Sequence, residues 1–287
     1  MPHRPEPAAP APDFAEQDHP PESDRADRDR APEATHETGP LVEADPGPPP
    51  PMELAARVTA NLAAASGVRR LILEPLVHWS FRAGQVAELV AEPGTEGYFA
   101  IASAPIELPR LSFLIKAGGS ASEPLMALAQ GRALTIRGPY GRGFDIPSVP
   151  RSPLVFIAAG TAIAAARSGL LHALGDVEVV PPGSLALVVG VRHEADLCFA
   201  DELLALARRG VVIRVAVSRP EAPLTAPHLR HGRVHDHLAD LVTPATLAFL
   251  AGSDAFEDDV EAALGTLGVG HAQIQRNYRP DHRSNPA

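Results

Sequence analysis

Residues 97–105 read GYFAIASAP, an aromatic residue followed by small side chains and a closing proline. The apolar alternation predicts a strand, and the proline is expected to end it. Small side chains at Ala100, Ala102 and Ala104 would let a planar group approach the backbone beside the Phe99 ring. The same composition also suits a tightly packed barrel strand that binds nothing, so what surrounds the stretch has to decide.

The segments on either side, up to about residue 150, are short, apolar and separated by glycines and prolines. This spacing predicts an antiparallel β-barrel. One helix is expected near Glu123–Ala129, with Ser122 as its N-cap. The expected strands are Ala55–Ala60, Val68–Leu73, Val86–Ala91, Tyr98–Ser103, Leu111–Lys116 and Leu134–Arg137.

Beyond residue 150, continuous apolar strands alternate with amphipathic helices, which predicts buried parallel strands joined by helical crossovers. Ligands of such sheets bind at the carboxyl ends of the strands. Gly160, Arg192, Ser218 and Gly252 all fall at such ends. The expected strands are PLVFIA (153–158), SLALVVG (184–190), VVIRVAV (211–217), LAFLA (247–251) and AQIQ (272–275), and the expected helices are IAAARSGLLHAL (163–174), FADELLALA (199–207) and FEDDVEAAL (256–264).

The amino-terminal segment, residues 1–51, has a different composition. It holds 14 of the 31 prolines and 12 acidic residues against four arginines, with almost no large apolar side chains. Such a segment cannot bury enough apolar surface to offset its chain entropy, so we expect it to be disordered. It carries most of the net charge of −10, so the acidic balance does not describe a binding face, and no nucleic-acid partner is expected. The expected division is this tail, a barrel domain at 52–149, an α/β domain at 150–279 and a short tail at 280–287.

A single cysteine, Cys198, excludes an intramolecular disulfide and an iron–sulfur cluster ligated by cysteines of this chain alone. No apolar run is long enough for a membrane span, and the amino terminus does not resemble a signal peptide. We therefore expect a cytoplasmic protein. Four histidines between His228 and His237 show no converging third ligand, so no metal site is expected.

Several motifs resemble those of the ferredoxin–NADP reductase superfamily and occur in that family's order, over roughly residues 53–279. The resemblance implies a small antiparallel FAD-binding barrel followed by a parallel-sheet NAD(P)-binding domain. The motifs are FRAGQ (81–85), GYFAIASAP (97–105), GGSASEPL (118–125), GPYGRGF (138–144), AAGTAIAAARS (158–168), GVRHEADLCFADEL (190–203) and LAGSDAFEDDVEAAL (250–264).

On the flavin side, the resemblance implies that Phe99 packs against the flavin ring and that Ala100 lies near the nitrogen that passes the hydride. Ser122 and the helix behind it would offer an anion site for the pyrophosphate. The family's pyrophosphate-binding arginine is replaced by Gly97. A charged hydrogen bond of that kind is worth about 1.5–3 kcal/mol, so we expect FAD to be bound weakly.

On the nicotinamide side, Gly160 and Thr161 keep the first strand–helix turn of the family's motif, while Ala159 and Ala162 replace glycines and are expected to crowd it. Gly252 is expected to leave room for the nicotinamide ring.

The resemblance assigns Ser218 and Arg219 to the 2′-phosphate of NADPH, with Arg192 nearby. A solvated loop charge is an equally good interpretation of Arg219, and the neighbouring Glu221 favours NADH. Tyr278 is interpreted as a strand-end tyrosine rather than an aromatic cover for the flavin.

The resulting hypothesis is a flavin-dependent oxidoreductase that passes a hydride between NAD(P)H and FAD and delivers electrons to a separate acceptor protein or a small molecule. The alternative is a non-catalytic relative with eroded cofactor sites that serves in binding or regulation. The candidate cofactor-binding residues are Phe99, Ala100, Ile101, Ser103, Gly119, Ser122, Gly160, Thr161, Ala162, Arg192, Ser218, Arg219, Gly252 and Ser253.

Overall fold

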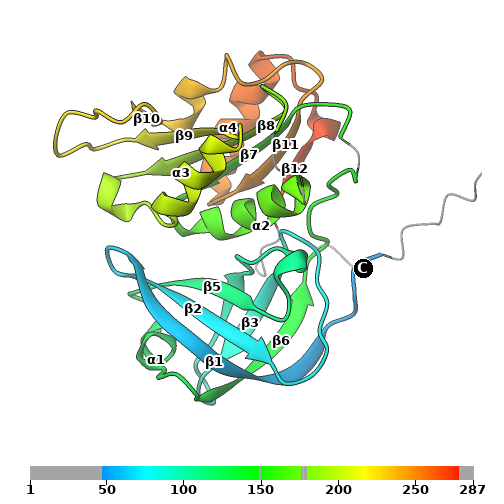
Figure 1. Cartoon of the computed structure of the whole chain (residues 1–287), viewed down its shortest axis with the longest axis vertical. Coiled ribbons are helices and arrows are strands. Elements are labelled where there is room, and N and C mark those ends of the chain that lie inside the picture. Colours follow the sequence, from blue (N-terminus) through cyan, green and yellow to red (C-terminus); the bar gives the residue numbers. More distant parts are fainter. Residues whose placement is uncertain (1–46, 149, 176, 178–179, 278–287) are drawn as a thin grey trace, which may run out of the picture. The chain divides into compact units, whose positions relative to one another are not determined.

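The computed structural model describes residues 47–148, 150–175, 177 and 180–277. Its strands form one antiparallel and one parallel sheet, which lie on opposite sides of residue 150 in the sequence (Figure 1). The expected fold class, a small barrel followed by a parallel-sheet domain, is therefore confirmed. Most of the tail predicted to be disordered, the short tail at 280–287 and Tyr278 lie outside the described residues.

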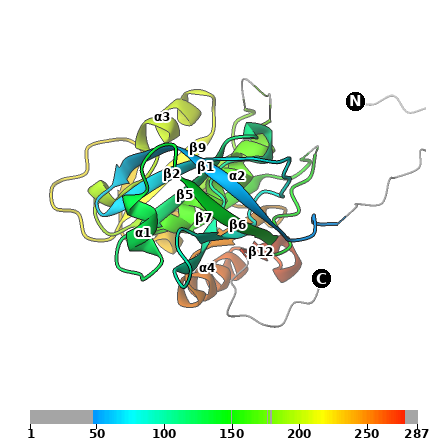
Figure 2. The same ribbon diagram turned by 90° about the horizontal axis from the view of Figure 1, so that it is seen from below.

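The antiparallel sheet has the strand order β4-β3-β6-β1-β2-β5. Its two edge strands meet through an isolated bridge between Ile101 and Phe113, which brings the sheet close to a closed barrel. Figure 2 shows β1, β2 and β6 side by side, as their antiparallel pairing requires. The strands are β1 (Met52–Ala65), β2 (Val68–Pro75), β3 (Val86–Val90), β4 (Glu96–Ala100), β5 (Leu111–Lys116) and β6 (Ala133–Tyr140).

The barrel core follows from the two-residue period of its strands. In β1 the side chains of Ala56 and Val58 are buried, whereas their neighbour Arg57 is exposed. The core is filled by large apolar side chains, and Trp79 and Phe81 stack against each other at a ring separation of 5.6 Å.

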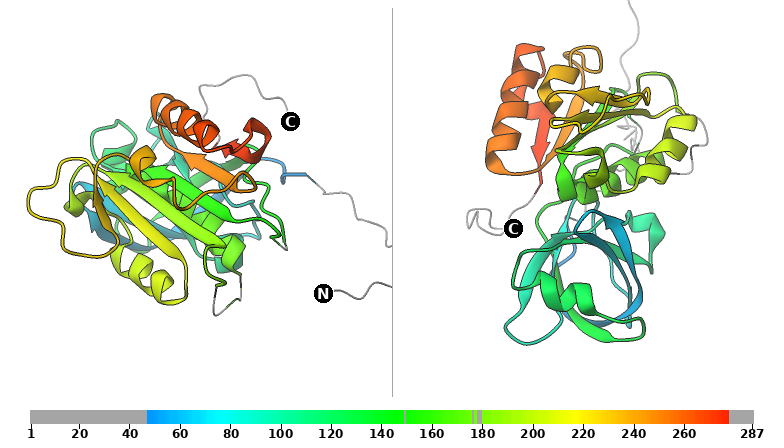
Figure 3. Two further views of the ribbon diagram at one scale, coloured as in Figure 1. Left: turned by 90° about the horizontal axis from the view of Figure 1, so that it is seen from above. Right: turned by 90° about the vertical axis from the view of Figure 1, so that its left-hand side faces the viewer.

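Helix α1 (Ser122–Ala127) lies at one end of the barrel (Figure 3, right). The Asn61 side-chain amide donates to the carbonyls of Leu125, Met126 and Leu128 at 2.9–3.2 Å, so it satisfies carbonyls that the helix end would leave unpaired.

The start of α1 lies one residue before the predicted one, and Ser122 is not its N-cap. The N–H of Ser122 donates to the Gly119 carbonyl at 3.0 Å, which places Ser122 inside the first turn. Ala121 takes the N-cap position without a side-chain hydrogen bond. The helix also ends earlier, at Ala127.

The second sheet is parallel throughout, in the order β10-β9-β8-β7-β11-β12. The order reverses between β7 and β11, which marks the point where ligands of such sheets bind. The strands are β7 (Leu154–Ala159), β8 (Leu185–Val191), β9 (Val212–Val217), β10 (Leu229–His231), β11 (Leu247–Ala251) and β12 (Ile274–Arg276).

Helices cover both faces of the parallel sheet. Helices α2 (Ile163–Leu174) and α3 (Ala200–Arg208) pack on one face, and α4 (Asp254–Thr266) packs on the other (Figure 3, left). The central strands are therefore buried on both sides, which explains their unbroken apolar sequences.

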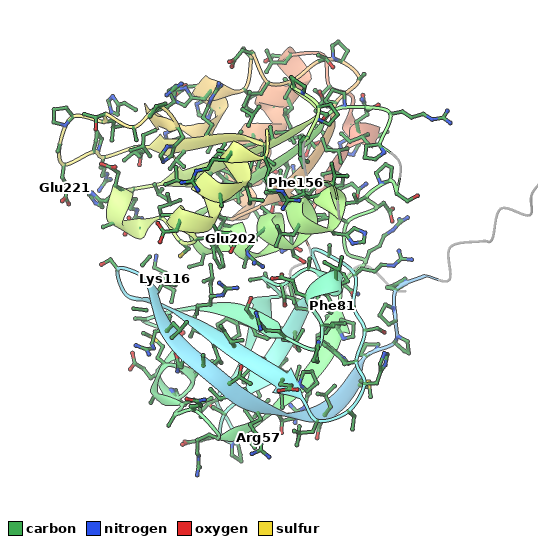
Figure 4. The ribbon with its side chains drawn as sticks, viewed as in Figure 1. Arg57, Phe81, Lys116, Phe156, Glu202 and Glu221 are labelled. Atoms are coloured by element: carbon green, nitrogen blue, oxygen red, sulfur yellow. The ribbon has the colours of Figure 1, made fainter. Side chains whose placement is uncertain are left out.

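The barrel and the parallel sheet are joined through buried polar contacts to α2. Arg167, which is 3 % exposed, donates to the Ala102 carbonyl at 2.6 Å and to Glu107 at 2.8 Å, both in the barrel half. Its Nε donates to Glu202 of α3 at 2.7 Å. Figure 4 labels Glu202 on the α3 side of this cluster. Because a buried guanidinium requires such partners, Arg167 ties the two halves at one place.

Within the described ranges, no helix is long and apolar enough to cross a membrane. In the same residues, no group of three or more His, Cys, Asp or Glu side chains is arranged to hold a metal ion.

Candidate functional site

A cleft of about 990 Å³ opens along the carboxyl ends of the parallel strands. It is lined by the turns that follow β7, β8, β9 and β10, by the first half of α4 and by part of the barrel. Of the residues predicted from the sequence, the cleft brings together Gly160, Thr161, Arg192, Ser218, Arg219 and Ser253.

The first turn of the cleft depends on a glycine. Gly160 has φ +55°, in the left-handed region that other residues rarely adopt, and the space beside it is open. Thr161 lies next to it, ahead of α2. Ala162 packs against the apolar cluster beneath the sheet and is not among the cleft residues, whereas Ala159 is. Of the two methyl groups expected to crowd the first strand–helix turn, only that of Ala159 therefore faces the cleft.

The turns after β8 and β9 are held together by hydrogen bonds. The N–H of Arg219 donates to the Arg192 carbonyl at 2.8 Å, and the Ser218 hydroxyl donates to the Val191 carbonyl at 3.3 Å. Two guanidinium-bearing residues therefore follow adjacent strand ends, an arrangement that suits an anionic ligand.

Glu221, two positions after Arg219 in the sequence, has a side-chain contact with His193. Figure 4 labels Glu221, which follows β9 in the sequence. One of its carboxylate oxygens lies 3.3 Å from Nδ1 of His193, which follows β8. The preference for NADH that the position of Glu221 suggested stays a prediction.

Sequence reasoning missed two cationic residues of the cleft. Lys116, at the end of β5, is exposed and lines it from the barrel side (Figure 4), and Arg233 lines it after β10. Lys116 is the only lysine in the chain, a signal that an arginine-rich composition makes easy to dismiss. Arg233 belongs to the turn after a three-residue strand that was not predicted.

The end of β11 differs from the expectation that Gly252 leaves room for a ring. An ideal Cβ at Gly252 would lie 2.3 Å from Cδ1 of Phe256, so the phenylalanine ring already fills that space. Phe256 lines the cleft, and its N–H donates to the Ser253 hydroxyl at 3.3 Å, which makes Ser253 the N-cap of α4. A ligand at this end would meet Phe256 and Ser253 first.

Glu257 lies behind the same turn. It is 1 % exposed, and its Oε1 accepts the N–H of Gly252 at 3.0 Å. Burial raises the pKa of Glu257 to about 7, and the hydrogen bond from Gly252 opposes part of that rise.

On the barrel side, the start of α1 lies directly against Gly97. An ideal Cβ at Gly97 would lie 2.6 Å from Cβ of Ala121 and 2.8 Å from Cε2 of Phe99. The glycine therefore permits a close approach, and an arginine at this position could not be placed without a shift of the backbone.

The remaining flavin-side candidates have structural partners. Ile101 is fully buried in the barrel core, and its N–H donates to the Gln85 carbonyl at 3.1 Å. The Ser103 hydroxyl accepts the N–H of Ser112 at 3.0 Å, and the Ser103 carbonyl accepts the hydroxyl of Ser168 at 2.7 Å. These polar groups already have protein partners.

Ala100 packs against the apolar cluster beneath the parallel sheet, and Phe99 packs against the barrel core. Ser122 is buried and close to Gly119, since an ideal Cβ at that glycine would lie 3.2 Å from the Ser122 hydroxyl. None of these four residues is among those that line the cleft.

The donor sets of the two sides fit the two expected cofactors unequally. The cleft offers cationic side chains and a glycine turn at the carboxyl ends of parallel strands, which fits a dinucleotide. The β4–α1 contact offers an aromatic ring and small side chains that suit a flavin ring, but the place of the family's arginine is filled by Ala121. A charged side chain at position 97 would require β4 or α1 to shift.

Comparison with known proteins agrees with this architecture. The family described as the oxidoreductase NAD-binding domain matches residues 156–262. Ferredoxin–NADP reductase B of Sorangium cellulosum is 34 % identical over 214 residues, covering 68 % of this chain and 85 % of the relative. The ferredoxin–NAD(+) reductase component of the Xanthobacter autotrophicus alkene monooxygenase system is 29 % identical, covering 75 % and 66 %. The solved cytochrome P450 reductase of Amycolatopsis is 25 % identical with a TM-score of 0.68, covering 79 % and 69 %.

The chain therefore belongs to the ferredoxin–NADP reductase superfamily of electron-transferring oxidoreductases, as the motifs indicated. FAD and NAD(P)H are the cofactors of this superfamily, so the expected cofactor classes are confirmed at that level. The individual site residues stay predictions.

Proposed function

We propose that the protein is an NAD(P)H-dependent flavin oxidoreductase whose nucleotide binds in the cleft along the parallel strands. The observation that carries the proposal is the convergence of Gly160, Arg192 and Arg219 on one cleft at the carboxyl ends of those strands. A left-handed glycine turn ahead of a helix suits the approach of a phosphate, and the two arginines supply charge.

The residues of the chain bind and orient rather than carry protons. Gly160 and Thr161 receive the nucleotide at the first turn, and Ser253 and Phe256 bound the opposite end of the cleft. Phe99 and Ala100 would hold the flavin ring, with Ser122 nearby. FAD, when bound, accepts a hydride and can release electrons singly to a partner. Positioning of two rings is the main contribution expected of the protein.

The acceptor is proposed to be a separate protein or a small molecule. The Xanthobacter relative is a reductase component of a larger system, and the Sorangium relative is named for ferredoxin. With one cysteine, this chain cannot ligate an iron–sulfur cluster through cysteines alone, so a separate acceptor would have to take the electrons from the flavin. The proposed location is the cytoplasm.

The contact between Gly97 and Ala121 favours a second candidate function. If the β4–α1 contact stays closed, the barrel cannot retain FAD, and the protein would bind a nucleotide without oxidising it.

The two candidates are distinguished by one set of measurements on the full chain. The absorbance spectrum of the purified protein is recorded before and after incubation with FAD and removal of the excess, and NADH oxidation is followed with ferricyanide as acceptor. The reductase predicts FAD uptake and FAD-dependent NADH oxidation. A protein that binds NADH but takes up no FAD and oxidises nothing would establish the second candidate.

A further inference from the structure

Glu257 and Arg167 are the two charged residues with buried side chains among the residues that the structure describes. Arg167 joins the barrel to the parallel sheet, whereas Glu257 lies in the first turn of α4, behind the end of β11. Its helix neighbours on the same face, Val260 and Leu264, belong to the apolar cluster under the sheet. An apolar side chain would suit that surrounding, so packing alone does not explain a carboxyl group at position 257.

The carboxyl group holds the turn that ends β11. Glu257 Oε1 accepts the Gly252 N–H at 3.0 Å from within the protein. The Phe256 ring leaves no space for a Cβ on the same glycine. Two consecutive residues of α4, Phe256 and Glu257, therefore contact the turn at Gly252. The Ser253 hydroxyl also accepts the Phe256 N–H.

The turn at Gly252 and Ser253 forms part of the cleft wall. Ser253 and Phe256 line the cleft, whereas Glu257 and Gly252 do not. Any displacement of Gly252 would move both lining residues, because Ser253 follows it directly and Phe256 packs against it. We propose that Glu257 is the positioning residue of this end of the nucleotide cleft, setting the place of Ser253 and Phe256 through its hydrogen bond to Gly252. This inference rests on the proposed nucleotide site.

The charged groups around Glu257 have their own pairings. Asp258 and Glu261 of α4 pair with Arg276 of β12, with N–O distances of 2.7 and 2.5 Å. Burial raises the pKa of Glu257 to about 7; the Gly252 N–H and Arg276 oppose part of this rise, whereas Asp258 and Glu261 add to it. An ionised acceptor makes a stronger hydrogen bond than a neutral one. The hydrogen bond from the Gly252 N–H to Glu257 should thus strengthen as the pH rises through 7.

The test uses the full chain and NADH, which lacks a 2′-phosphate that would titrate in the same range. The dissociation constant is measured by fluorescence titration at pH 6 and pH 8 for the wild type, Glu257→Gln, Glu257→Leu and the control Glu74→Gln, which changes an exposed carboxyl group of the barrel strand β2. We expect the wild type and the control to bind NADH roughly five-fold more tightly at pH 8, the ratio between a charged and a neutral acceptor. Glu257→Gln should show a smaller pH dependence, and Glu257→Leu should bind more weakly at both values. His235, which also lines the cleft, is the same in all variants, so differences between the variants report on position 257.

A second readout is independent of nucleotide binding. The amide nitrogen shift of Gly252 should titrate near pH 7 in the wild type and in Glu74→Gln, and should be constant in Glu257→Gln. If the wild type binds no NADH at either pH, the proposed nucleotide site fails, and the Gly252 titration still decides whether Glu257 holds the turn. Unchanged pH dependence in Glu257→Gln, or a Gly252 shift that titrates in that variant, overturns the inference.

Discussion

Adding one methyl group at Gly97 tests whether the β4–α1 contact is closed. In Gly97→Ala the new Cβ would lie 2.6 Å from the Ala121 Cβ and 2.8 Å from the Phe99 ring, where something must shift. Overpacking of this kind typically costs about 1–3 kcal/mol. In a folded unit of this size, each kcal/mol corresponds to roughly 2–4 °C, so the melting temperature should fall by about 2–12 °C.

A double-mutant cycle shows whether the clash at Gly97→Ala comes from Ala121 or from Phe99. Ala121→Gly should melt close to the wild type, because glycine is well accepted at an N-cap. Combined with Gly97→Ala, it removes the nearer of the two contacts and should recover at least half of the lost stability. Gly265→Ala serves as the matched control, since nothing lies within 4 Å of an added Cβ there, and it should be neutral or slightly stabilising.

The assay is thermal unfolding followed by circular dichroism, with FAD uptake measured on each variant. A Gly97→Ala protein that melts within about 1 °C of the wild type would show that α1 does not rest on β4. Strict additivity of the two substitutions would exclude Ala121 as the source of the clash.

Four further outcomes are expected. The folded protein keeps a proton on Glu257 that the unfolded chain loses above its ordinary pKa of 4.5, so the contribution of this group to stability should be greatest below that pH and be lost, by up to about 3 kcal/mol, as the pH rises through 7; chemical denaturation of the wild type and of Glu257→Gln should differ by this component of the pH dependence. Arg167→Met should lower the free energy of unfolding by about 3 kcal/mol, because two carboxylates lose their buried cation; a variant as stable as the wild type would contradict this. Arg219→Ala should weaken NADPH at least ten-fold and NADH about two-fold or less, and equal losses would make Arg219 a general charge in the loop. A chain starting at Met52, the first residue of β1, should melt within error of the full chain, whereas a clear loss would show that the preceding segment docks.

The strands and helices were largely predictable because their signals are local. The apolar run of 163–174 gave the bounds of α2 correctly, and the carboxyl-end turns of β7, β8 and β9 followed from where the apolar strands stop. Strand β10 was missed because three residues, two of them exposed and charged or polar, carry no periodic signal.

The site was harder to predict because its details depend on distant contacts. The sequence shows that an arginine is replaced by Gly97, but not that Ala121, 24 positions later, fills the space. It shows a small residue at Gly252, but not that Phe256 turns back over it. Nothing within the motif at 250–264 singles out Glu257, since its proposed role depends on burial and on one backbone hydrogen bond.

The single lysine of the chain allows the cleft to be labelled selectively. Apart from the amino terminus, Lys116 is the one primary amine in a chain of 287 residues, and it is exposed where the barrel meets the cleft. An amine-directed dye, applied at a pH where the side-chain amine reacts, would attach at the rim of this cleft without any engineered substitution. Its emission would then report the arrival and departure of a nucleotide directly, whichever acceptor the electrons finally reach.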